Sequence, residues 1–113
     1  MGTILQIRVS AWTYNEAEVE EAWPRLAELA FSMPLKHHKR GVLEMVTALD
    51  DGLRFMNWPA TLKDSIAPGL KSAVAIKDRL EGALADWDPR RADRLSHELE
   101  DALDAVEASC KLA

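Results

Sequence analysis

Hydrophobic residues recur every three or four positions along most of this chain, the spacing that places side chains on one face of an α-helix. Four helical segments follow from this pattern. They run from about residue 16 to 32, from 34 to 56, from 64 to 87 and from 89 to 110. The third has an alternative, kinked start near residue 60. We therefore expect a mainly α protein, folded as an antiparallel helical bundle of about four helices.

Proline and capping residues mark where these helices begin and break. Asn15 is a suitable N-cap for the first helix, and Pro24 predicts a kink or a break at residues 20–23 because proline lacks a backbone donor. Asp88 and Pro89 supply the cap and first-turn residue of the fourth helix. The chain of 113 residues has the length of one domain, so residues 1–113 are expected to form a single domain.

The N-terminal residues 4–14, ILQIRVSAWTY, follow a different pattern. Leu5, Ile7 and Val9 alternate with polar residues, which is typical of a β-strand. Residues 1–14 would then form an oligomerisation arm. A helical alternative runs through Ile4, Ile7, Ala11 and Trp12. No later segment has a strand pattern, so a strand here would pair with a second copy of the chain or with a partner. This predicts a homo-oligomer, most simply a dimer.

Composition narrows the classes of function. Apolar residues make up 48% of the chain and charged residues 29%, a balance typical of a folded soluble protein. The net charge of −5 disfavours nucleic acid and anionic membranes as partners, since both attract cationic surfaces. A single cysteine, Cys110, allows no intramolecular disulfide, and no secretory signal is visible, so a cytoplasmic location is expected.

A basic stretch, PLKHHKRG, spans residues 34–41. Lys36, Lys39 and Arg40 would lie in the first turns of the second expected helix, where the helix dipole favours anions. An acidic protein partner or a bound anion could offset this placement. The acidic residues 16–21 of the neighbouring helix could offset it equally well, and that would require no function.

The histidines of this stretch raise a phosphotransfer alternative. His37 would face solvent, Arg40 follows it by three residues and Gly41 by four. This spacing is similar to that of histidine-containing phosphotransfer domains, which are helical bundles of about this length. The resemblance implies His37 as the phosphoacceptor, Arg40 at the family's lysine position and Gly41 as the small neighbour. The chain departs from the family at Lys39, where an apolar residue is usual.

The four tryptophans suggest a further alternative. Trp23 and Trp87 are in phase with apolar stripes, and Trp58 adjoins a helix end, so core packing is expected for these three. Trp12 does not fit a stripe, and neither do Tyr14 and Phe55, which assigns them to a contact surface instead. A cavity beside the tryptophans would indicate a small-ligand-binding bundle.

Signatures of catalysis and of metal or cofactor binding are absent from the sequence: there is no glycine-rich phosphate loop, no nucleophile elbow and no paired ligand motif. The sequence thus favours a non-catalytic protein–protein interaction or adaptor protein without cofactor or metal. The interaction residues expected in it are Leu5, Ile7, Val9, Trp12, Lys36, Lys39 and Arg40.

Overall fold

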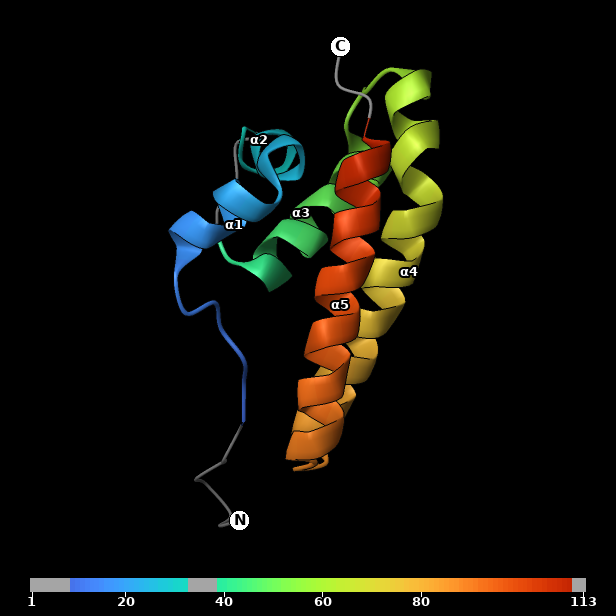
Figure 1. The fold of residues 1–113 in the computed structure, drawn as a ribbon. Coiled ribbons are helices and arrows are strands. Elements are labelled where there is room, and N and C mark those ends of the chain that lie inside the picture. Colours follow the sequence, from blue (N-terminus) through green and yellow to red (C-terminus); the bar gives the residue numbers. More distant parts are fainter. Residues whose placement is uncertain (1–8, 33–38, 111–113) are drawn as a thin grey trace, which may run out of the picture.

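The computed structural model describes residues 9–32 and 39–110 of the chain. These residues form five α-helices and no strand, which confirms the mainly α prediction. The two long helices are α4 (Ala60–Ala85) and α5 (Pro89–Ser109). They run antiparallel as a hairpin, and α1 (Glu16–Ala22), α2 (Pro24–Phe31) and α3 (Val42–Phe55) lie to one side of it (Figure 1). None of these helices is long and apolar enough to cross a membrane.

The first expected helix is two helices in the structure. It breaks at Trp23, whose backbone (φ −132°, ψ 67°) leaves the helical region, and α2 begins at Pro24. This confirms the break that Pro24 predicts. The cap expected at the start of α1 is also present, because the side chain of Asn15 accepts a hydrogen bond of 3.0 Å from the backbone N–H of Ala17.

The beginning of α3 differs from expectation, whereas α4 begins where the alternative start near residue 60 places it. Residues 39–41 precede α3, which starts at Val42, so the part of the basic stretch that is described is not helical. Helix α4 starts at Ala60, which places Pro68 inside the helix rather than in its first turn. The turns before Pro68 stay helical because Leu62 and Ile66 bury their side chains in the core.

The N-terminal strand is not seen among the described residues. Residues 9–14 are extended without belonging to a strand or a helix, and residues 4–8 lie outside the described part of the chain. Residues 15–32 and 39–110 contain no second strand, so they give residues 9–14 no partner for the ladder that defines a strand.

The core fills the space between the hairpin and the three short helices. Its side chains come from all five helices and correspond largely to the expected stripes. Among the least exposed are Leu26, Met45, Leu49, Ile66, Leu70, Leu99 and Leu103. Lys77 is the one charged residue among the regularly spaced apolar residues of α4. Its ammonium group contacts the carboxylate of Glu81 at 2.8 Å on the surface. A lysine stem can pack on apolar neighbours in this way while its charge reaches the surface.

Three hydrogen bonds tie the start of α2 to the end of α5. The carboxylate of Glu107 accepts hydrogen bonds from the backbone N–H groups of Arg25 (2.7 Å) and Leu26 (3.2 Å), which lie in the first turn of α2. In return, the guanidinium of Arg25 donates to the carbonyl of Cys110 at the end of α5, at 3.2 Å. Each helix therefore satisfies open backbone groups at the end of the other.

The tip of the hairpin corrects an expectation about Trp87. This residue is 64% exposed rather than part of the core, since the helical stripe ends at Ala85. The backbone N–H of Trp87 bonds to the carbonyl of Leu84, and that of Asp88 bonds to the carbonyl of Ala83, which is a Schellman ending. Trp87 occupies its left-handed position with φ 58°, where glycine is the usual residue.

We expect Trp87→Gly to raise the free energy of unfolding by about 1 kcal/mol, because it relieves the left-handed strain and the exposed ring contributes little packing. Trp87→Ala is the matched control: it removes the same ring and keeps the strain, so it should not stabilise the protein. Urea denaturation followed by circular dichroism measures both changes. A destabilised glycine variant would show that the ring packs more tightly than its exposure indicates.

Candidate functional site

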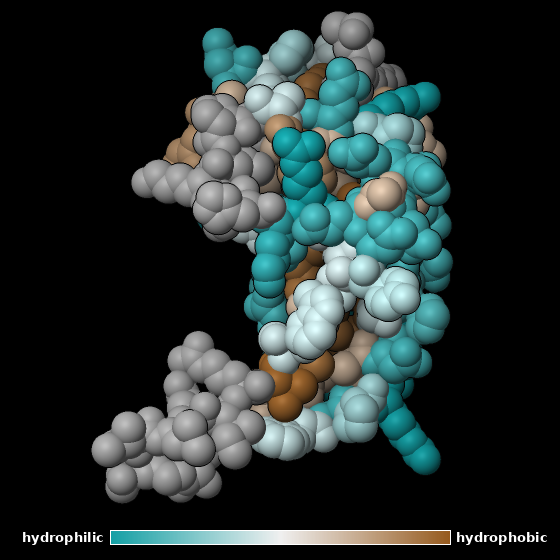
Figure 2. Space-filling view, turned by 90° about the vertical axis from the view of Figure 1, so that its left-hand side faces the viewer, coloured by the Kyte–Doolittle hydropathy of each residue, from teal (hydrophilic) through white to brown (hydrophobic). Residues whose placement is uncertain are grey.

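Residues 9–14, called here the extended segment, expose three large hydrophobic side chains. Val9 is 42% exposed, Trp12 74% and Tyr14 98%. Exposed large side chains were expected at Trp12 and Tyr14, which fit no helical stripe, and the structure confirms their exposure. Figure 2 views the molecule from the side of Figure 1 on which the short helices lie, and shows hydrophobic surface among hydrophilic residues there. Of the other expected interaction residues, Leu5, Ile7 and Lys36 lie outside the described residues.

The end of the extended segment is attached to α3. The hydroxyl of Thr13 accepts a hydrogen bond of 2.8 Å from the backbone N–H of Val42, the first residue of that helix. The preceding residue, Gly41, has no side chain with which to cap α3. A Cβ atom at Gly41 would lie 2.6 Å from the Thr13 hydroxyl oxygen, so glycine at this position permits the close approach. Thr13 thus caps α3 from a distant part of the sequence.

The backbone of the extended segment is open. Residues 9–14 make no backbone-to-backbone hydrogen bond with any other described residue. Hollows of about 480 Å³ lie on both sides of the segment, where it passes the α4–α5 hairpin. Val9 and Leu84 line the first hollow, and Trp12 and Leu99 line the second. A segment with open backbone groups and exposed apolar side chains has the properties of a strand awaiting a partner.

The second hollow, called here the acidic groove, was not expected from the sequence. It lies between the extended segment, α1 and the α4–α5 hairpin. Trp23, which is buried, forms part of its wall, and its indole N–H donates to the carboxylate of Asp104 at 2.8 Å. Glu18 and Glu100 also line it. The sequence does indicate one acidic face, because Glu100 and Asp104 lie on the same side of a helix at i,i+4 spacing. Nothing in the sequence placed α1 opposite them.

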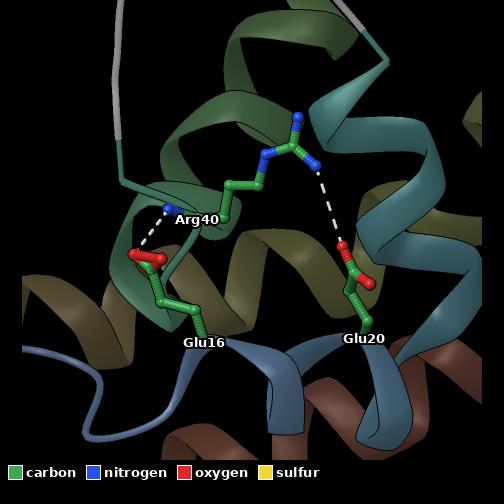
Figure 3. Close-up of polar contacts among 3 residues, drawn as sticks. All are labelled: Glu16, Glu20 and Arg40. Atoms are coloured by element: carbon green, nitrogen blue, oxygen red, sulfur yellow. Dashed lines mark hydrogen bonds and ion pairs between the residues drawn. The ribbon is translucent and has the colours of Figure 1, made fainter.

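The basic stretch finds acidic partners within the molecule (Figure 3). The backbone N–H of Arg40 donates to the carboxylate of Glu16 at 3.0 Å, and its guanidinium lies 3.8 Å from the carboxylate of Glu20. The guanidinium also lies over the ring of Phe31, 5.7 Å from its centre. At Arg40 alone, these contacts agree with the interpretation that the acidic first helix offsets the cations. Lys39 has no ion pair with a described residue.

The phosphotransfer pattern gains no support from the described part of the stretch. Arg40 and Gly41 are not helical, so they do not share a helical face as the spacing requires. Arg40 is moreover occupied by Glu16, Glu20 and Phe31. His37 lies outside the described residues, and its phosphorylation stays an untested prediction.

Two other reactive side chains, Cys110 and His97, belong to α5 and its C-terminal cap. Cys110 is buried at the end of α5. This burial is the main cause that raises the pKa of its thiol above the ordinary value; the nearby Glu107 carboxylate raises the pKa further, and Arg25 lowers it. The neutral thiol therefore prevails at neutral pH. His97 lies 3.9 Å from Asp93 on an exposed face of α5. No group of three metal-ligating side chains occurs in residues 9–32 and 39–110.

Comparisons with protein-family models, curated proteins and solved structures found no match to this chain. Its function has to be inferred from its own residues and contacts.

Proposed function

We propose that this chain is a non-catalytic protein–protein interaction protein, and that it self-associates through the extended segment. The open backbone of residues 9–14 carries the proposal. Exposed backbone donors and acceptors on an extended segment form a template for another strand. Pairing two copies of the segment bonds the backbone groups of alternate residues, those on the edge of each segment that faces the other. The alternation of residues 4–14 in the sequence extends this template toward the N-terminus.

The side chains of the segment favour the same contact. Val9 and Trp12 would be covered by the equivalent residues of a second copy, which removes apolar surface from water. Tryptophan and tyrosine are also the residue types that most often dominate interfaces. The attachment of Thr13 to α3 and the cap at Asn15 fix one end of the segment, so less conformational entropy is lost on pairing than for a free tail.

A Val9→Ser and Trp12→Ser double variant tests the proposal, with mass measured by light scattering. The wild-type chain should have twice its monomer mass of 12.6 kDa at about 100 µM, and this variant should be a monomer. Its matched control is the Phe55→Ser and Trp87→Ser double variant, which removes two exposed aromatic residues elsewhere and should stay dimeric. A monomeric wild type, or a control variant that alone dissociates, would contradict the proposal.

A further inference from the structure

The acidic groove carries an inference that does not depend on self-association. We propose that it binds a small organic cation with an apolar body, such as a quaternary ammonium compound. The groove measures about 480 Å³, which falls within the range of roughly 300 to 1,000 Å³ that is typical of small-molecule sites. Most of its lining side chains are apolar or aromatic, and the remainder define the charge of its occupant.

The charges of the groove have one sign. Glu18, Glu100 and Asp104 line it, and no Lys, Arg or His of the described chain does so. None of these three carboxylates forms an ion pair with a described residue. This differs from the acidic residues around Arg40, where the chain supplies its own cation. The groove therefore holds negative charge that a positively charged ligand would complement.

Two tryptophan side chains in the walls of the groove are the second feature that favours a cationic ligand. Trp12 and Trp23 come from the extended segment and from the break between α1 and α2, and both line the groove. The face of an indole ring attracts a cation, and tryptophan does so more strongly than the other aromatic residues. Trp23 is held in place by its hydrogen bond to Asp104, so this part of the wall is fixed before a ligand arrives.

The combination selects the chemical class of the ligand. A simple metal ion would gain little from the apolar and aromatic walls, and no group of three metal-ligating side chains occurs among the described residues. A neutral apolar molecule would leave the carboxylates uncompensated. An ammonium group surrounded by methyl or methylene carbon satisfies both parts. Glu18 and Glu100 are exposed, so binding should weaken as salt screens them.

Choline is a suitable probe, and its tert-butyl analogue, in which carbon replaces the nitrogen, is the neutral comparison. In an NMR titration of the full chain, the indole N–H resonances of Trp12 and Trp23 should shift saturably with choline. Those of Trp58 and Trp87, which do not line the groove, should not. The neutral analogue should give no saturable shift.

Two matched double variants distinguish the effect of the carboxylates in the groove from the effect of the protein's net charge. Glu18→Gln with Glu100→Gln should weaken choline binding about tenfold. Glu21→Gln with Glu98→Gln removes the same charge from the same two helices outside the groove and should leave binding unchanged. Equal responses to choline and its analogue, or equal losses in both variants, would overturn the proposal. The proposal would also be overturned if the indole N–H resonances of Trp12 and Trp23 shifted with protein concentration but not with choline, because a second copy would then fill the groove.

Discussion

Leu103→Ala should lower the free energy of unfolding by about 3 kcal/mol, the largest effect that we expect from a single substitution. Leu103 is completely buried on α5, in the core shared by the hairpin and the short helices. Its removal leaves a cavity that neighbours from several helices must collapse to fill. Urea denaturation monitored by tryptophan fluorescence measures the change.

Leu84→Ala is the control for this substitution. Leu84 is half-buried on α4, beside the hollow that Val9 also lines, so the same change of side chain should cost less than half as much. Equal losses at the two positions would mean that the hairpin and short helices do not enclose the core as the structure shows.

Glu107→Ala should lower the free energy of unfolding by about 2 kcal/mol. The carboxylate caps the first turn of α2, and Trp23, the N-cap residue of that helix, makes no hydrogen bond of its own with its side chain there. Without Glu107, the N–H groups of Arg25 and Leu26 lose their acceptor. An eight-residue helix depends strongly on such contacts, because its own turns are too few to be stable alone.

The matched control is Glu98→Ala, which removes the same charge from an exposed face of α5. Its effect should stay within about 0.5 kcal/mol of wild type. Thermal unfolding followed by circular dichroism compares the two variants. If Glu107→Ala were as stable as Glu98→Ala, the link between α2 and α5 would contribute nothing to the fold.

The parts of the fold that depend on local chemistry were predictable. Pro24 ends α1 because it lacks a backbone donor, and Asp88 with Pro89 begins α5 because a carboxylate caps the turn that proline opens; the side chain of Asp88 accepts from Arg91 N–H at 3.2 Å. The buried residues of α5 also recur every three or four positions, the spacing that defines one helical face, and are Ala92, Leu95, Leu99, Leu103 and Val106.

The parts that depend on distant residues were not predictable. The start of α3 at Val42 needs Thr13, which is far away in the sequence, as its capping group. The exposure of Trp87 follows from the left-handed turn at the end of α4, which the continuing stripe concealed. The acidic groove required α1 and α5 to face each other. Sequence patterns do not contain these long-range relationships.

The candidate site was partly predictable for the same reason. Trp12 and Tyr14 could be assigned to a contact surface because they fit no apolar stripe, and both are exposed. The basic stretch was ambiguous from sequence alone, because a cation cluster can face a partner or a neighbouring helix. In the structure, the guanidinium of Arg40 lies 3.8 Å from the carboxylate of Glu20, so at that residue the neighbouring helix supplies an acidic group.

Amide hydrogen exchange of residues 9–14 tests self-association through the extended segment most directly. The account predicts fast exchange at about 1 µM protein and marked protection of alternate amides at about 100 µM, because association by mass action pairs the backbone groups that the single chain leaves open. Exchange that stays fast at both concentrations, in a sample that light scattering shows to be dimeric, would place the contact between copies elsewhere and contradict the account.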